Sequence, residues 1–245
     1  MIYKLSNTAS STTLKTIFNK SLKYPNLYRK QILINGAEEA TILIITSEEN
    51  QLLVPAIWGI LPENYKNNWH SFQEVYNSLN IPIESLSQLS WCNTAFKKRR
   101  CLIPVTGFYT SYLINGELYP YYFHNELDVP FCLLGIYNKT EDGFSTCTIL
   151  TSTSDYPLRK LSNINGTLPL MLSKAVHNDW LNEDLTDIEI KNLLKSKADF
   201  KLIGHPISKE FYNNNISYSS MLSKVLYDDA PSKIVLSRSS ELIVQ

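Results

Sequence analysis

The sequence has little glycine and little cysteine, with 8 and 4 among its 245 residues. The glycines form neither a GxGxxG nor a GKS/T pattern, which excludes the common phosphate-binding loops. A GxSxG nucleophile elbow is also lacking. The four cysteines contain no CxxC pair, and three of them stand in apolar, strand-like stretches. This pattern predicts reduced thiols in the core.

Net charge and long apolar runs are also absent. Lysine plus arginine and aspartate plus glutamate both number 23, so no global field attracts the protein to nucleic acid or membrane. No apolar run approaches the roughly 18 residues that a membrane span needs. The first dozen residues are polar and do not resemble a signal peptide. We therefore expect a cytoplasmic protein that has no membrane contact.

Histidine is sparse, and no HExxH motif occurs. The four residues His70, His124, His177 and His205 are isolated from one another and from the cysteines. We interpret each as a surface or structural residue. The sequence therefore predicts no metal site and no cofactor.

Short apolar and aromatic stretches are what the sequence does contain. Hydrophobic residues make up 44% of the chain, with 15 tyrosines and 9 phenylalanines. Strands are expected at 2–5, 32–34, 41–46, 52–60, 131–137, 145–151 and 168–172, and helices at 10–18, 173–181 and 186–194. From Asp199 the chain reads as polar and irregular. This order favours an α+β class, with a curved, mainly antiparallel or barrel-like sheet and a few peripheral helices, in a single domain over 1–245.

Residues 97–123 carry the clearest local signal. A basic run leads into apolar residues, Gly107 interrupts them, and Asn115-Gly116 precedes a returning aromatic strand. Asn-Gly readily supplies the two positive φ angles of a tight hairpin turn. The segment predicts a β-hairpin with a bulge or kink near Gly107.

The basic run at 97–100 is flanked by Trp91, Phe96 and the hairpin tyrosines. Cations beside flat rings suit a groove for single-stranded nucleic acid, because the cations contact phosphates and the rings stack on bases. A charged strand end that faces water explains the same residues equally well.

The order of several motifs resembles the SRAP (SOS response-associated peptidase) family, whose members process abasic sites in DNA. The matching stretches are WGILP at 58–62, KKRRCLIPVTGFY at 97–109, NGELYPYYF at 115–123, FCLLGIY at 131–137, TILTSTSDYPL at 148–158, TLPLML at 167–172 and HPISK at 205–209. They extend along nearly the whole chain. The resemblance implies the barrel-like α+β fold of that family.

The resemblance also implies a chemistry. Family members expose a cysteine at position two, whose α-amine and thiol together capture the aldehyde of an abasic site in single-stranded DNA as a thiazolidine. A glutamate in the hairpin and a histidine on a later loop assist proton transfer, and an asparagine orients the sugar. That asparagine corresponds to Asn80 in this sequence.

This sequence departs from the family at each reactive position. The cysteine, glutamate and histidine fall on Ile2, Thr110 and Ser162, and three arginines fall on Pro82, Asn93 and Thr167. Hydroxyl groups do not titrate near neutral pH, so Thr110 and Ser162 do not replace an acid and a base. We therefore predict no intact catalytic residue beyond the retained Asn80.

Three functional hypotheses follow. The first is a catalytically degenerate SRAP-like protein with a weak single-stranded DNA groove, whose candidate contacts are Asn35, Trp58, Tyr65, Asn80, Lys98, Arg99 and Arg100. The second is a residual lyase that uses the α-amine of a retained Met1 to form an imine with abasic DNA. The third is a scaffold that presents Tyr109, Tyr112 and Tyr122 to a protein partner that the sequence does not identify.

Overall fold

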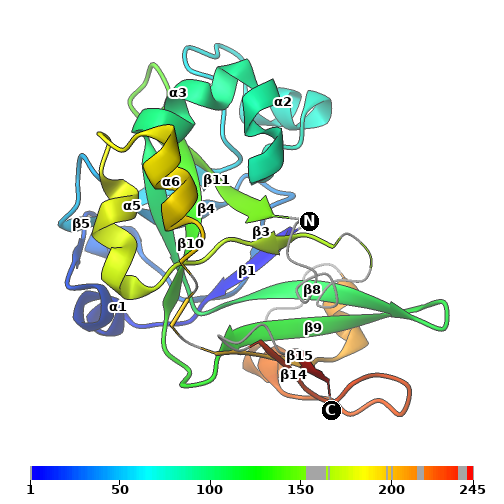
Figure 1. Ribbon diagram of the computed structural model, residues 1–245. Coiled ribbons are helices and arrows are strands. Elements are labelled where there is room, and N and C mark those ends of the chain that lie inside the picture. Colours follow the sequence, from blue (N-terminus) through cyan, green and yellow to red (C-terminus); the bar gives the residue numbers. More distant parts are fainter. Residues whose placement is uncertain are drawn as a thin grey trace.

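A computed structural model describes residues 2–152, 164, 166–196, 198–199, 201–213, 218–236 and 242–244. Two sheets and a group of helices make up this part of the chain (Figure 1). The helices α2, α3, α5 and α6 lie on the barrel side of the molecule, and the long strands β8 and β9 extend away from them. The predicted α+β class with a barrel-like sheet is confirmed.

Five strands close into a barrel. They follow the order β11-β10-β7-β4-β5, and a parallel pairing of β5 with β11 closes the ring. Short strands extend this sheet at β2, β12 and β6. The bounds are β2 Ser21–Leu22, β4 Thr41–Thr46, β5 Leu52–Trp58, β6 Asn80–Pro82, β7 Arg100–Val105, β10 Phe131–Lys139, β11 Ser145–Ser152 and β12 Leu168–Pro169.

The second sheet has the order β15-β14-β13-β9-β8-β1-β3. Its strands are β1 Lys4–Asn7, β3 Gln31–Asn35, β8 Gly107–Ile114, β9 Glu117–Asn125, β13 Leu202–Pro206, β14 Ile234–Leu236 and β15 Leu242–Val244. The expectation of irregular chain after Asp199 is therefore wrong. The five residues of β13 pair with β9. This pairing stabilises the strand, which its short apolar pattern alone does not predict.

The helices are short. Ser10 caps α1 by accepting a hydrogen bond from the Thr13 amide, and the helix lies within the predicted range 10–18. Thr186 and Glu189 form a reciprocal capping box on α6. The bounds are α1 Ser11–Phe18, α2 Trp69–Val75, α3 Ser90–Lys98, α5 His177–Leu181 and α6 Asp187–Leu193, with 3-10 turns η1 Pro25–Leu27, η2 Ile83–Gln88, η3 Lys174–Val176, η4 Lys209–Tyr212 and η5 Ser219–Leu222.

The segment 97–123 is divided between the two sheets. Its first strand, β7, pairs with β4 and β10 in the barrel, so it is not an arm of the hairpin. The chain crosses into the second sheet at Gly107, and β8 then pairs with β9. The turn residues Asn115 and Gly116 have φ angles of 50° and 83°, which confirms the predicted hairpin turn.

The core consists of two main clusters. Alternate side chains of β4 enter different clusters: Ile42 and Ile44 pack toward the second sheet, and Leu43 and Ile45 toward the helices. All four cysteines are buried and unpaired, as predicted. No helix in the described ranges is long and apolar enough to cross a membrane.

Gly107→Ala should lower the free energy of unfolding by about 1–3 kcal/mol, because overpacking strains a filled site. An added Cβ would lie 2.4 Å from the Tyr122 ring and 2.5 Å from the Phe123 carbonyl oxygen. Urea unfolding measures the change. Leu113→Ala on the exposed part of the same strand is the control, and equal effects of the two substitutions would contradict this packing.

Candidate functional site

A cavity of about 260 Å³ opens beside the amino terminus. Its walls come from the start of the chain, from β8, from η4 and from the segment that precedes β12. In Figure 1 the amino terminus lies at the end of β1, the strand that pairs with β8. Ile2, Thr110 and Thr167 all line this cavity. Three positions that the sequence assigned to the family's reactive site therefore lie together.

Ile2 is part of the hydrophobic core. It is 1% exposed, and its side chain belongs to the cluster that joins the barrel to the second sheet. The Asn80 side-chain amide donates a 2.6 Å hydrogen bond to the Ile2 carbonyl oxygen. Asn80 is itself buried on β6, which pairs with β11. The retained asparagine therefore holds the first strand in place here.

Asn80 has one unused polar atom. Its Oδ1 is buried, and no donor in the described ranges reaches it. The amide donor is engaged by the main chain of Ile2, whereas the acceptor is free.

The threonine side chains of the cavity wall do not act as acids or bases. Thr110 is buried at its wall on β8, and Thr167 is half-buried. Neither hydroxyl group titrates near neutral pH. Ser162, to which the resemblance assigned the family's histidine, lies outside the described residues, as does Met1.

Lys4 is the one charged side chain among the described residues that line the cavity. Its Nζ donates to the Phe211 carbonyl oxygen at 3.2 Å and lies 4.2 Å from the centre of the Phe211 ring. Burial lowers the pKa of Lys4, and the charge of Glu38 partly opposes that shift. Lys4 was not among the site residues predicted from the sequence. Its place at the cavity depends on Phe211 of η4, far along the chain, which no local pattern indicates.

The basic run does not form part of this cavity. No residue of 97–100 lines it in the described structure. Arg100, expected to contact DNA, is 2% exposed, and its guanidinium donates to the carbonyl oxygens of Trp180, Phe96, Lys97 and Asn182. Its guanidinium group is therefore bound by main-chain carbonyl groups inside the protein.

The neighbours of Arg100 differ from it in exposure. Arg99 is half-buried and pairs with Glu63 at 3.1 Å, and its Nε donates to the Asn138 amide oxygen. Lys98 is exposed and donates to the Glu183 carbonyl oxygen at 3.3 Å. The run is therefore divided among three different environments and forms no continuous phosphate-binding strip.

The other predicted groove residues are also dispersed. Trp58 is fully buried, and its indole nitrogen donates to the Leu79 carbonyl oxygen at 2.9 Å, so no base can stack on it. Tyr65 is half-buried with its ring edge-on to Phe72. Asn35 holds its own turn through the Ala37 amide and the Glu38 carboxylate. The sequence alone did not distinguish these buried rings from exposed ones, because aromatic residues occur both in cores and at surfaces.

The tyrosines proposed to face a protein partner are buried as well. Tyr109, Tyr112 and Tyr122 are 3%, 7% and 5% exposed. Tyr109 donates to the Ile32 carbonyl oxygen at 2.6 Å, and the tilted ring of Tyr122 lies beside it with 5.0 Å between the ring centroids. This face cannot present these rings to a partner in the structure.

Comparison with known families decides the relationship. A family model described as SOS response associated peptidase (SRAP) matches residues 1–214. The chain belongs to the SRAP family. A comparison with curated proteins gave no match.

Solved structures support the SRAP fold. A protein from Bacteroides thetaiotaomicron superimposes with a TM-score of 0.79 at 19% identity, over 91% of this chain and 100% of that one. A protein from Bordetella bronchiseptica gives 0.68 at 17% identity, over 84% and 99%. A phage-related protein from Bordetella bronchiseptica gives 0.61 at 14% identity, over 84% and 94%. At these identities the likeness shows the fold alone.

Asn80→Ala should lower the free energy of unfolding by about 1–3 kcal/mol, because it leaves the buried Ile2 carbonyl without its donor. Chemical denaturation measures the loss. The matched control is Asn93→Ala on the exposed face of α3, expected within about 0.5 kcal/mol of the parent. Similar values for both variants would show that the amide does not hold the strand.

Arg100→Met should lower the free energy of unfolding by about 1–3 kcal/mol or more, because it leaves several carbonyl oxygens without their hydrogen-bond donor. Lys98→Met, two residues away and exposed, should change the stability by about 0.5 kcal/mol or less. Thermal unfolding followed by circular dichroism compares them. An Arg100 variant as stable as the Lys98 variant would place Arg100 at the surface.

Proposed function

We propose that this SRAP-family protein has lost the thiol-dependent capture of abasic sites and retains a weak contact with single-stranded DNA at the Ile2 cavity. The observation that carries the proposal is the composition of this cavity. Ile2 lies at its base as a buried aliphatic side chain, and Thr110 stands at the hairpin position of the family's glutamate. The family membership supports the scaffold, and the loss of reactive groups is our inference from these residues.

The lost chemistry follows from the functional groups. An aliphatic side chain at position two offers no sulfur to close a thiazolidine on an imine. A threonine hydroxyl offers no proton donor or acceptor poised near neutral pH, and such a donor commonly contributes about a hundred- to ten-thousandfold in rate. Within the described residues, the thiol nucleophile and the carboxylic acid are therefore both missing from the cavity wall.

Incubation with single-stranded DNA that carries one abasic site tests this loss. We expect no adduct that survives denaturing electrophoresis, whereas a SRAP-family protein with cysteine at position two serves as the positive control. The thiazolidine needs both an amine and a thiol on the same residue. A heat-stable adduct formed by the unaltered protein would contradict the proposal.

The DNA contact should be weak because one cation lines the cavity within the described residues. Each phosphate contact contributes about 0.7 to the slope of log affinity against log salt for single strands. Fluorescence anisotropy with an unmodified oligonucleotide at low salt should therefore give a slope of about −0.7, which Lys4→Gln removes. The negative charge of Glu38 interacts with Lys4 and opposes an approaching phosphate, so Glu38→Gln should strengthen DNA binding slightly.

Lys98→Gln is the matched control for Lys4→Gln, because Lys98 is exposed and does not line the cavity. A steep salt dependence, or a larger loss from Lys98→Gln than from Lys4→Gln, would place the contact elsewhere. Tight binding would refute the weakened site.

One observation favours a second candidate function, a slow lyase without a cross-link. The Lys4 amine lines the cavity, and burial lowers its pKa, which increases its neutral fraction. A neutral amine attacks the aldehyde carbon, and the resulting carbinolamine loses water to give an imine. Loss of the C2′ proton to water expels the 3′ phosphate, and hydrolysis of the imine then releases the amine. Met1, whose α-amine offers the same chemistry, lies outside the described residues.

Borohydride trapping on abasic single-stranded DNA tests this candidate. Peptide mapping of the trapped adduct distinguishes the Lys4 amine from the α-amine, and Lys4→Arg should abolish only the first. Absence of any trapped adduct would end the lyase hypothesis and leave the binding proposal intact.

A further inference from the structure

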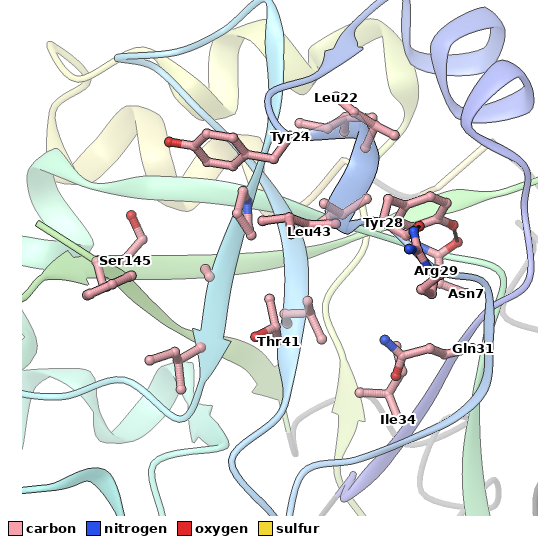
Figure 2. Close-up of a pocket in the computed structure, with 17 residues that line it drawn as sticks. Asn7, Leu22, Tyr24, Tyr28, Arg29, Gln31, Ile34, Thr41, Leu43 and Ser145 are labelled. Carbon is pink, nitrogen blue, oxygen red and sulfur yellow. Dashed lines mark hydrogen bonds between the residues drawn. The ribbon is translucent and has the colours of Figure 1, made fainter.

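A second cavity, of about 320 Å³, opens over β4 and β5 and shares no lining residue with the Ile2 cavity. Its volume falls in the range of about 300–1,000 Å³ that is usual for small-molecule sites. Most of its wall is aliphatic, including Leu22, Ile34, Leu43, Leu53, Pro55 and Ile57 (Figure 2). Such a wall suits a ligand with a hydrocarbon body.

The cavity lies at a gap in the barrel wall. On one side of β5, the strand β2 pairs with Leu52 and Leu53, and β11 pairs with Ile57 and Trp58. Between these pairings β5 has β4 as its partner on the other side. Pro55 lies in this gap and has no N–H group that would need a strand partner. The opening is therefore compatible with the hydrogen-bonding needs of the sheet.

Three large apolar side chains stand at the rim in contact with water. Tyr24, Leu27 and Phe144 are 49%, 74% and 64% exposed, and all three line the cavity. Exposed apolar groups gathered around one opening mark binding surfaces. A ligand seated here would remove part of this surface from water.

Arg29 is the one charged side chain among the described residues that line the cavity. Its Nη1 donates to the carbonyl oxygens of Asn26 and Tyr28, both at 2.8 Å, which orients the guanidinium. In the described ranges no carboxylate pairs with it. Figure 2 shows Arg29 at the end of the cavity where Asn7 and Gln31 also lie. An oriented guanidinium without a carboxylate matches a carboxylate ligand.

Two of the other polar groups at that end, those of Tyr28 and Asn7, are already engaged. Tyr28 donates to the Ala9 carbonyl oxygen at 2.8 Å, and the Asn7 amide donates to the Pro104 carbonyl oxygen. Burial raises the pKa of Tyr28 to about 12, so its hydroxyl keeps its proton at neutral pH and adds no negative charge. Arg29 therefore sets the sign of the ligand.

We propose that this cavity binds a medium-chain aliphatic carboxylate, with its hydrocarbon chain over β4 and β5 and its carboxylate on Arg29. The site is separate from the proposed DNA contact and does not depend on it. The apolar wall supplies affinity and the single cation supplies selectivity for the anion over a neutral analogue.

Calorimetric titration of the whole protein with decanoate and with decanol, both below their aggregation concentrations, tests the proposal. Decanoate should bind about fivefold more tightly than decanol, since an exposed ion pair contributes up to about 1 kcal/mol. Arg29→Gln should remove this preference without weakening decanol binding. The preference should also shrink as salt rises.

Two further variants make the result decisive. Lys30→Gln alters the exposed neighbour of Arg29 that does not line the cavity, and it should preserve the preference. Phe144→Ser at the exposed rim should weaken both ligands alike, with the melting temperature unchanged. Absence of binding, equal affinity for the two ligands, or equal effects of Arg29→Gln and Lys30→Gln would overturn the proposal.

Discussion

The hydrogen bond from the Asn80 amide to the Ile2 carbonyl oxygen is the contact on which the amino-terminal half of the site depends. It joins β6, which is attached to the barrel through β11, to the start of the second sheet. The side chain of Ile2 packs into the same core cluster. One residue thus fixes the first strand by its main chain and fills the core by its side chain. The cavity above it is bounded by this arrangement.

This arrangement has a chemical consequence. A group that reacts with an aldehyde must be reached by solvent and substrate, whereas an aliphatic group gains by leaving water. Ile2 satisfies the second condition and Lys4, two residues later, remains at the cavity wall. The SRAP scaffold therefore carries at this position a packing residue followed by a cation. In our proposal that pair suits weak anion contact better than covalent capture.

The sequence predicted the features that depend on local chemistry. The helix α1 forms within the predicted range 10–18, and Asn115-Gly116 makes the predicted tight turn, because these residues have conformational preferences that act within a few positions. The burial of Trp58 and Arg100 could not be predicted in this way. Both residue types occur at surfaces and in cores, and the carbonyl oxygens that bind Arg100 come partly from residues some 80 positions away.

The strand β13 illustrates the same limit. Leu202–Pro206 offers a short apolar pattern in a polar region, and it forms a strand because it pairs with β9, which lies far away in the sequence. Lys4 could not be predicted from local patterns either, because its partner in the cavity, Phe211, lies on η4 at the other end of the chain.

The burial of Ile2 is tested most directly by the unfolding free energy of Ile2→Ala beside that of Ile188→Ala. Ile188 is a 72% exposed isoleucine on α6, so its truncation should change stability by about 0.5 kcal/mol or less. If Ile2 has become a core residue, its truncation should cost about 2–5 kcal/mol. Equal and small effects for the two variants would show that position two is an open site, contrary to this account.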